Sequence, residues 1–501
     1  MKKNKINYKL LGATIFLFIA LLFSLTTKWA LKNFDFTVEE LIFHLKVPMK
    51  GANLVVLFDF LRKCLLKTFI YVFIITFILR NPFEWKLNAK IKNKIINVYP
   101  LNYNETIYFI FTLILMIFSI FSAFNKIGIT AYFNDQISKS TFIEDNYVEP
   151  KEVNLVFPEK KKNLIYVFVE SLEPTYLSKN VGGYQEVNLM PRLTELSNKY
   201  INFSNTSIIG GALTVPGVTW TIGAIVSETA GIPLKIPIEE NSYGEYKTFL
   251  PGAYTLGEIL NKEGYNQLFM MGSDAIFGGR KSYLESHGNY QIFDYYTAKE
   301  RGKIENDYYV WWGFEDNKLF EYAKEEITNL ASTNEPFNFT MLTVDTHFPG
   351  GYLSSECETL FDDNLSNVAY CTDKKINEFV NWIQNQPFYE NTTIVIAGDH
   401  TSMDANFFSD VTDYERTTYN LFINSSVSTD NLKNRYFTTM DYFPTTLASL
   451  GVQIDGNKLA LGTNLFSNEE TLVEKYGIDY VRKELAKRSN FYNKKFIYND
   501  K

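Results

Sequence analysis

The chain has 501 residues, of which 46% are apolar and 21% are charged, and its formal net charge is −7 at pH 7. This composition supplies enough apolar side chains for a large core and excludes a disordered chain. The acidic balance, with basic residues confined to short stretches, argues against a nucleic-acid partner. We therefore expect a membrane region followed by one sizeable domain.

Three apolar segments near the N-terminus predict transmembrane helices: Leu10 to Leu31, Leu65 to Leu79 and Ile107 to Phe124. The first and third are long enough to cross a hydrocarbon core of about 30 Å, which takes about 20 residues. The second is shorter and carries Lys67 near its start, which can extend its amine to the interface. A cleavable signal peptide is the alternative for the first segment, but its apolar run continues without a small-residue cleavage site.

Basic residues predict the orientation of these segments. They precede the first segment and crowd the connection between the second and third: Lys2, Lys3, Lys5, Arg80, Lys86, Lys90, Lys92 and Lys94. The positive-inside rule places both stretches in the cytoplasm, so a chain with three spans has everything after about residue 126 outside it. Arg62, Lys63 and Lys67 would then lie on the outer side, which argues against this orientation.

The remaining segments divide the chain further. Val38 to Leu61 predicts a partly apolar helical elbow in the membrane interface, where His44 would be structural or lipid-facing. Residues 126–162 form a polar linker, residues 163–470 an extracytoplasmic domain, and residues 471–501 a tail that we expect to be helical.

In the domain, apolar runs typical of strands alternate with helical stretches. The expected strands are Leu164 to Val169, Gln267 to Met271, Phe339 to Val344, Thr393 to Ala397 and Asn420 to Ile423. Helices at Leu193 to Tyr200 and Leu319 to Leu330 fall between them. This alternation predicts an α/β fold with a mainly parallel sheet, helices on both faces, and ligands at the carboxyl ends of the strands.

Polar residues that could bind a metal follow two of these strands. Glu170 comes directly after the first, and Asp399 and His400 come after the fourth, which Gly398 closes. Two carboxylates and an imidazole suit Mn²⁺, Zn²⁺ or Mg²⁺ and exclude a thiolate site. The alternative is that Glu170 caps a helix beginning near Ser171 and that His400 is a solvated loop residue.

A candidate nucleophile lies in the segment Pro216 to Ala224. A turn bounded by glycine leads into a helix of small residues, which places Thr219 or Thr221 at a helix N-terminus. The positive end of the helix dipole favours an anion there. The alternative is a close-packed helix in which a threonine serves as the N-cap.

Cys357 and Cys371 are the two cysteines of the outer part and are expected to lie in a loop, since Cys64 lies within or beside a span. An even pair outside the cytoplasm predicts a disulfide, and two free buried thiols are the alternative.

The ordered set of Glu170, the two threonines and Asp399-His400 resembles the alkaline phosphatase/sulfatase superfamily. Within it, the chain is most similar to the branch of lipoteichoic acid synthases and phosphoglycerol transferases, particularly those that decorate periplasmic glucans. The similar segments are Val169 to Glu173, Pro216 to Val226, Gly231 to Leu234, Phe277 to Arg280, Ser286 to Gly288, Trp311 to Phe314, Leu342 to Gly351 and Gly398 to His400.

The resemblance implies an alkaline-phosphatase-like fold in which Glu170, Asp399 and His400 bind Mn²⁺ together with a nucleophilic threonine. Thr221 stands ten residues before Gly231, as the sulfatase nucleophile does before its helix-ending glycine, whereas Thr219 keeps the Gly-x-Thr spacing of lipoteichoic acid synthase. We favour Thr221. The Cys/Ser-x-Pro-x-Arg sequence of formylglycine sulfatases is absent.

The resemblance also implies that Arg280 and His347 bind the phosphate of the substrate. Taken alone, an arginine in a glycine-rich loop could be solvated, and a histidine before Phe-Pro could simply pack. His287 is expected to be structural, and Trp311 to Phe314 to pack or line the lipid-side rim of the site.

The implied function is a membrane-anchored phosphoglycerol transferase that uses phosphatidylglycerol as donor and a cell-envelope glycan or a glycerolphosphate polymer as acceptor. Its catalytic domain would lie outside the cytoplasm. A phosphoethanolamine transferase of the same fold and a catalytically silent headgroup sensor are the alternatives. Phosphoethanolamine transferases commonly carry several disulfides in the outer domain, whereas one pair is available here.

Overall fold

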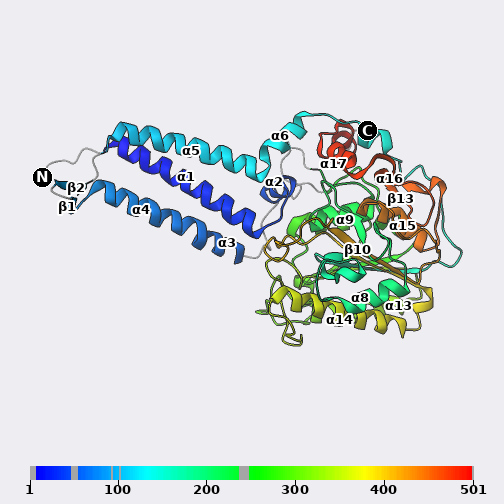
Figure 1. The fold of residues 1–501 in the computed structure, drawn as a ribbon. Helices are drawn as coiled ribbons and strands as arrows, with labels where there is room; N and C mark the ends of the chain where they lie inside the picture. Colours follow the sequence, from blue (N-terminus) through cyan, green and yellow to red (C-terminus); the bar gives the residue numbers. More distant parts are fainter. Residues whose placement is uncertain (1–6, 47–54, 92–93, 101–102, 236–247, 499–501) are drawn as a thin grey trace. The chain divides into compact units, whose positions relative to one another are not determined.

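The structure of the protein is a computed structural model that describes residues 7–46, 55–91, 94–100, 103–235 and 248–498 (Figure 1). The chain divides into two compact units. The first comprises Met1–Phe34 and Asn53–Phe133, and the second comprises Asp35–Ala52 and Asn134–Lys501.

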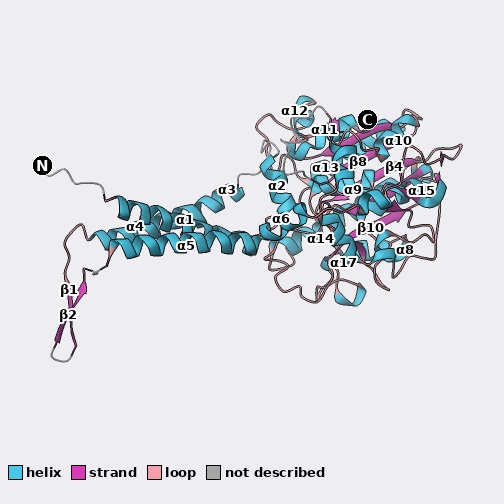
Figure 2. Cartoon of the chain, turned by 90° about the horizontal axis from the view of Figure 1, so that it is seen from above, coloured by secondary structure: helices cyan, strands magenta, loops and turns pink. Residues whose placement is uncertain are grey.

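The first unit contains three helical segments that lie side by side (Figure 2). Among the described helices, α1 (Tyr8–Asn33) and α5 (Glu105–Ile127) are long and apolar enough to cross a membrane. The third expected span is α4 (Lys67–Arg80), which continues helical turns from α3 (Val55–Phe60) and a π-helical turn at Leu61–Leu66. A hairpin of β1 (Leu87–Ile91) and β2 (Lys94–Tyr99) follows α4.

The basic residues that argued against the orientation have a local counter-charge in this unit. Asp59 lies 3.8 Å from Arg62 and 3.0 Å from Lys63, and it accepts a hydrogen bond from the indole of Trp29 at 2.8 Å. Because Asp59 offsets part of their charge, Arg62 and Lys63 contribute less net positive charge beside α3 than their number suggests.

The second unit is built on a seven-stranded sheet with the strand order β5-β10-β9-β4-β8-β6-β7. The strands are β4 (Asn163–Val169), β5 (Gly211–Leu213), β6 (Asn266–Met271), β7 (Gln291–Phe293), β8 (Phe337–Leu342), β9 (Thr392–Gly398) and β10 (Thr417–Ile423). The pairs β9-β4, β4-β8, β8-β6 and β6-β7 are parallel, and β10 is antiparallel to both of its neighbours. The expected α/β fold with a mainly parallel sheet is confirmed.

Alternate residues of the strands pack against helices on opposite faces, as the pleat requires. On one face, Tyr166 and Phe168 of β4 join a core with α9 (Thr221–Ala230), α10 (Leu256–Lys262) and α15 (Tyr442–Ser449). On the other, Ile165 and Val167 join α8 (Pro191–Lys199), α13 (Asp316–Ala331) and α14 (Asn364–Gln384). All seven residues of β4 are buried, so the central strand is held from both sides.

Short elements complete the second unit. They are α11 (Arg280–Ser286), α12 (Tyr295–Glu300), β12 (Lys458–Leu459) and β13 (Gly462–Thr463). The linker contains α6 (Ile129–Ile137), α7 (Phe142–Asn146) and β3 (Leu155–Val156), which pairs with β11 (Gln453–Ile454). The tail forms α16 (Leu472–Tyr476), α17 (Ile478–Ala486) and α18 (Asn490–Tyr492), and it buries Val481, Leu485 and Tyr492 in the core.

The segment expected to form an interfacial elbow is divided between the units. Helix α2 (Val38–Lys46) belongs to the second unit and α3 to the first, while residues 47–54 lie outside the described residues. Phe43 of α2 is fully buried in the core that contains Tyr166. Helix α2 is therefore part of the unit that contains the sheet, which the sequence did not indicate.

Candidate active site

Three acidic and imidazole side chains converge at the carboxyl ends of β4 and β9. One potential ligand atom from each of Glu170, Asp399 and His400 lies within 4.8 Å of the other two, and all three residues are buried. They come together because β4 and β9 pair in parallel with Val169 opposite Gly398. Gly398 is required there, since a Cβ would lie 1.9 Å from the carbonyl oxygen of Leu172.

Asp399 has one satisfied and one unsatisfied carboxylate oxygen. Oδ1 accepts hydrogen bonds from the backbone N–H groups of Ser171 and His400, both at 2.8 Å. Oδ2 is buried and accepts no hydrogen bond from any residue that the structure describes. Leaving such a group unpaired costs about 1–3 kcal/mol, so this oxygen is well suited to ligate a cation.

His400 is oriented with one ring nitrogen toward the carboxylates. Nδ1 donates to the carbonyl oxygen of Thr401 at 2.8 Å, and Nε2 lies 3.5 Å from Glu170 and 3.4 Å from Asp399. A hydrogen bond from the far nitrogen to a carbonyl is the usual support of a metal-binding histidine.

The pKa values of Asp399 and His400 show that the cluster is rich in negative charge. Burial, followed by the charge of Glu170, raises the pKa of Asp399 to about 7. Burial opposes the charged form of His400, but the carboxylates of Asp399 and Glu170 raise its pKa to about 9. The residues therefore fit a divalent cation, which would neutralise both carboxylates.

The two candidate nucleophiles differ in their surroundings. Thr221 is the first residue of α9 and is partly exposed. Thr219 lies two residues earlier, and its hydroxyl is 3.4 Å from that of Thr37, which precedes α2. Only the Thr219 hydroxyl has a hydrogen-bonding neighbour within the part of the chain that the structure describes.

Arg280 is buried at the start of α11. Its Nε donates to the carbonyl of Phe277 at 2.9 Å, and its Nη2 donates to the carbonyl of Asp274 at 2.8 Å. Burial lowers its pKa to about 10, although the charges of Glu170 and Asp274 oppose this shift. The guanidinium is thus a fixed cation in the electrostatic field of the acidic cluster.

His347 follows β8, the other neighbour of β4. Its Nδ1 donates to the carbonyl of Phe348 at 2.7 Å, and its ring lies 4.6 Å from that of Trp312. Burial lowers its pKa to about 4, and the charge of His400 acts in the same direction. His347 is therefore a neutral imidazole at pH 7.

Residues 162–452 match the family described as Sulfatase. The chain belongs to the sulfatase family. The membership agrees with the resemblance expected from the sequence.

Two relatives of this sulfatase-family chain are phosphoglycerol transferases. It is 31% identical over 318 residues to phosphoglycerol transferase I of Xanthomonas campestris pv. campestris (strain B100), covering 62% of this chain and 43% of the relative. It is 31% identical over 328 residues to phosphoglycerol transferase I of Salmonella choleraesuis (strain SC-B67), covering 64% and 41%. The chain thus spans about two fifths of the length of these relatives.

Two solved structures share the sulfatase-family fold. One is a protein in the alkaline phosphatase superfamily from Vibrio parahaemolyticus, with a TM-score of 0.50, 21% identity, and coverage of 64% of this chain and 74% of that one. The other is the lipoteichoic acid synthase LtaP from Listeria monocytogenes, with a TM-score of 0.50, 17% identity, and coverage of 70% and 95%. The expected alkaline-phosphatase-like fold is confirmed.

Sequence reasoning missed an arginine that is linked to the candidate metal cluster of Glu170, Asp399 and His400, called the metal cluster below. Arg416 binds Glu173 through two hydrogen bonds, from Nε at 2.9 Å and from Nη2 at 2.7 Å. Glu173 also accepts from the N–H of Ser402, two residues after His400, at 2.9 Å. Glu173 stood in a recognised motif, but Arg416 is 243 residues away in sequence and carried no local signal.

Helix α2 was also missed as a neighbour of the site. Arg416 donates to Asp35 at 2.9 Å, and the N–H of Asp35 donates to the carbonyl of Met403 at 2.9 Å. His44 of α2 stacks on Phe277 with ring centroids 5.9 Å apart. The expectation for this histidine was structural or lipid-facing, and its position beside Phe277 makes it a neighbour of Arg280.

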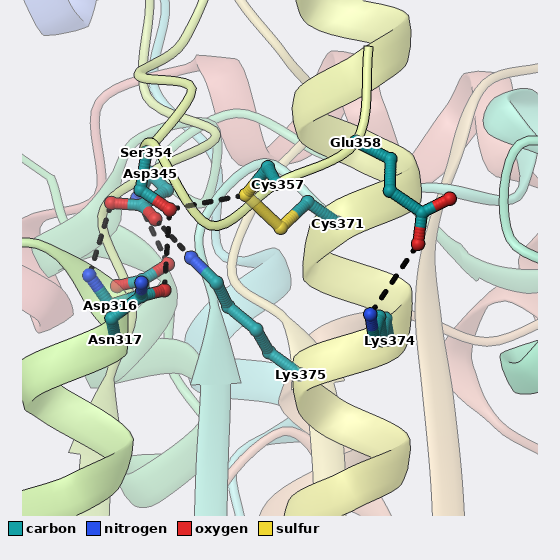
Figure 3. The surroundings of a disulfide bond; sticks show 9 residues. All are labelled: Asp316, Asn317, Asp345, Ser354, Cys357, Glu358, Cys371, Lys374 and Lys375. Carbon is teal, nitrogen blue, oxygen red and sulfur yellow. Dashed lines mark hydrogen bonds and ion pairs between the residues drawn. A yellow bond between two sulfur atoms is a disulfide. The ribbon is translucent and has the colours of Figure 1, made fainter. Parts of the chain in front are cut away.

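The disulfide between Cys357 and Cys371 is present (Figure 3). The expectation that both cysteines lie in a loop is wrong for Cys371, which is within α14. His287 is structural as expected, since its Nδ1 contacts Glu258 at 3.0 Å and its Nε2 contacts the carbonyl oxygen of Phe249 at 2.6 Å.

Proposed function

We propose that this chain is a membrane-anchored phosphoglycerol transferase that acts through a covalent threonine intermediate. The observation that carries the proposal is the cluster of Glu170, Asp399 and His400, with an unpaired buried oxygen on Asp399, in a domain 31% identical to phosphoglycerol transferase I. A binding module would need neither a cation site nor a nucleophilic threonine at the start of a helix.

The first half of the proposed reaction occurs at Thr221. Its Oγ attacks the phosphorus of phosphatidylglycerol, the bond from phosphorus to the diacylglycerol oxygen breaks, and diacylglycerol leaves with a proton. The product is a phosphodiester that joins glycerol to the threonine. The N-terminus of α9 and the Arg280 guanidinium favour the negative charge of the transferring group.

In the second half, a hydroxyl of the acceptor attacks the same phosphorus and Thr221 leaves with its proton restored. We propose that His347, which is neutral at pH 7, accepts the proton of the attacking hydroxyl and returns it to the leaving oxygen in each half. Its Nδ1 is held by a backbone carbonyl, which leaves Nε2 for the reacting groups.

We propose Mn²⁺ as the cation, held by Glu170, Asp399, His400 and Thr221, with Zn²⁺ and Mg²⁺ as substitutes. When bound, it would lower the pKa of the threonine hydroxyl and offset charge on the phosphate. The three proposed spans tether the domain outside the cytoplasm beside its lipid donor, which raises their encounter frequency. The acceptor would be a cell-envelope glycan or a glycerolphosphate polymer.

Two threonine variants test the intermediate. In full-length protein supplied with fluorescent phosphatidylglycerol, we expect Thr221→Ala to lower diacylglycerol release by at least about 10³-fold, as loss of a nucleophile does. Thr219→Ala is the matched control and should retain most of the activity. Mass spectrometry of wild-type protein should find the glycerophosphoryl adduct on the peptide that contains Thr221.

Two results would contradict this mechanism. Release that persists in both single variants would exclude a covalent threonine, and loss confined to Thr219→Ala would move the nucleophile to that residue.

For the acceptor, cell-envelope glycans are compared by mass spectrometry between cells with and without the gene. No glycerol phosphate increment on any glycan or teichoic polymer would refute the transferase proposal.

A further inference from the structure

The feature that the proposed mechanism leaves unused is Glu40, a buried carboxyl group on α2. Its side chain is 3% exposed. Oε2 is buried and has no hydrogen-bond partner among the residues that the structure describes, and Oε1 lies 3.8 Å from Nε2 of His44. A buried carboxyl oxygen without a partner is costly, so its retention calls for a ligand that supplies hydrogen-bond donors.

Helix α2 is fixed in place by contacts on its N-terminal side and at its centre. At its N-terminal side, Asp35 pairs with Arg416, and the hydroxyl of Thr37 is 3.4 Å from that of Thr219. At its centre, Phe43 packs against Trp220 with ring centroids 5.7 Å apart. Glu40 is therefore positioned by the same residues that flank the start of α9.

The carboxyl of Glu40 lies within the electrostatic reach of the metal cluster but outside it. Burial raises the pKa of Glu40 to about 8, the charge of His400 acts to lower it and the charge of Glu170 acts to raise it, so the carboxyl is largely protonated at pH 7. Even so, the group of potential ligands within 4.8 Å of one another contains Glu170, Asp399 and His400 and does not contain Glu40. Glu40 is therefore better suited to bind a substrate group beside the phosphate than to serve as a fourth metal ligand.

Aromatic rings connect α2 to the proposed phosphate-binding residues. His44 stacks on Phe277. The ring centroids of Phe277 and Trp312 are 5.5 Å apart, and those of Trp312 and His347 are 4.6 Å apart. The indole N–H of Trp312 is also buried without a hydrogen-bond partner in the described ranges. The row of side chains from α2 to His347, called the α2 wall below, therefore contains a carboxyl oxygen of Glu40 and an indole N–H of Trp312 that have no hydrogen-bond partner in the described part of the chain.

We propose that Glu40 is a substrate-binding residue that accepts hydrogen bonds from the glycerol hydroxyls of the phosphoglycerol group. The inference rests on the proposed function. The phosphate needs cationic and N–H partners, whereas the two free hydroxyls of glycerol need acceptors, and Glu40 supplies these on the α2 wall beside the metal cluster. The site thereby selects a polyol headgroup over one without hydroxyls.

The test compares donors that differ in the headgroup alone. Full-length protein in mixed micelles is given phosphatidylglycerol, phosphatidylmethanol or phosphatidylethanolamine, and kcat/KM for diacylglycerol release is measured. Glu40→Gln keeps the size of the side chain and replaces one acceptor oxygen by an amide. We expect the preference for phosphatidylglycerol over phosphatidylmethanol to fall about fivefold, as for a lost hydrogen bond to a neutral group.

Glu39→Gln is the matched control, because it makes the same change at the adjacent position, where the pKa responds to the charge of Lys235 rather than to that of His400. It should leave the donor preference unchanged. Glu40→Asp withdraws the carboxylate by one methylene, should also lower the preference, and decides the test if Glu40→Gln does not fold. Thermal unfolding of each variant shows whether the fold is intact.

The outcomes separate the two proposals. If the wild type releases diacylglycerol from none of the donors, the proposed function fails, and this inference fails with it. If the wild type is active but Glu40→Gln keeps the wild-type donor preference, or loses activity on phosphatidylglycerol and phosphatidylmethanol equally, the inference alone is refuted. Loss confined to phosphatidylethanolamine would mean that Glu40 binds an ammonium group, which also refutes it.

Discussion

Two buried acidic clusters lie beyond the carboxyl ends of neighbouring strands, and they differ in how their oxygens are satisfied. In the cluster of Asp316 and Asp345, all four carboxylate oxygens have a partner; Figure 3 shows the two aspartates with Lys375. Asp316 accepts from the N–H groups of Val344 and Asp345, and Asp345 accepts from the N–H of Asp316 and from Lys375 at 2.7 Å. In the metal cluster, Oδ2 of Asp399 has no such partner in the described structure.

The comparison shows that residue type and position at the sheet edge do not by themselves make a metal site. The cluster at β8 contains its own cation, Lys375, and so it is a structural element that supports the segment leading to His347. The cluster at β4 and β9 has the imidazole of His400 as its internal counter-charge, and Oδ2 of Asp399, 3.4 Å from Nε2 of His400, accepts no hydrogen bond in the described structure. An incomplete set of internal donors therefore distinguishes the candidate metal site from a structural cluster.

The largest expected effect comes from Asp399→Asn. The amide keeps the shape of the side chain and its Oδ1 acceptor but removes the charge that would bind the cation, so diacylglycerol release should fall on the order of 10³-fold or more. Without metal, the melting temperature should be unchanged or higher, because the repulsion from Glu170 is relieved. Thermal unfolding with EDTA and with Mn²⁺ measures both effects, and a Mn²⁺ stabilisation equal to that of wild type would contradict the assignment.

In the second cluster, Lys375→Met should act on stability. Lys375 is 12% exposed and Asp345 is 1% exposed, so the change leaves a buried carboxylate without its counter-charge. We expect a loss of about 3 kcal/mol in the free energy of unfolding, measured by denaturant unfolding in detergent. The adjacent Lys374→Met is the control: its exposed pair with Glu358 at 3.4 Å should contribute less than about 1 kcal/mol. Equal effects of the two variants would mean that the second cluster has no structural role.

The disulfide beside this cluster should contribute a similar amount. Cys357 and Cys371 are separated by 14 residues, and Ser354 contacts the sulfur of Cys357. Replacing both cysteines by serine should lower the free energy of unfolding by about 3 kcal/mol, mainly by releasing the unfolded chain. The Mn²⁺-induced shift in melting temperature should persist. Dithiothreitol should destabilise the wild type and leave the double variant unaffected, and an identical response of both proteins would refute the role of the disulfide.

The smallest effect is a dependence of the Lys375→Met loss on pH. Burial raises the pKa of Asp345, and Lys375 opposes this, so the variant should have a still higher folded pKa. A carboxyl whose folded pKa lies above its unfolded pKa loses stability as pH rises through the folded value. The loss should therefore be smaller at pH 5 than at pH 8, by about 1 kcal/mol. A loss that grows on acidification would show that protonated Asp345 still needs Lys375.

The strand ends were predictable from sequence because their signals are local. The apolar runs that form β4, β6, β8, β9 and β10 were long enough to be recognised, and Glu170, Asp399 and His400 follow such runs directly. The three-residue strands β5 and β7 were too short to show periodicity. The position of Cys371 was wrong because polar residues on the outer face of α14 hid its helical pattern.

Long-range partners could not be predicted from sequence. Arg416 and Glu173 meet because β10 joins the sheet beside β9, and no feature near either residue records that pairing. The sequence of helix α2 shows an apolar face, which is why we expected an interfacial helix. The sequence does not show which surface of the second unit this face covers. A sequence pattern shows that a face is buried but not what it is buried against.

The place of α2 in the second unit has a practical consequence for the preparation of soluble fragments. A fragment that begins after α5 would keep the sheet, the metal cluster and both threonines, but it would lack Asp35, Glu40 and Phe43. Phe43 is fully buried, so its removal would expose the indole of Trp220 next to Thr221. Kinetic constants from such a fragment would describe a site with one wall missing, and headgroup selectivity should be measured on the whole chain.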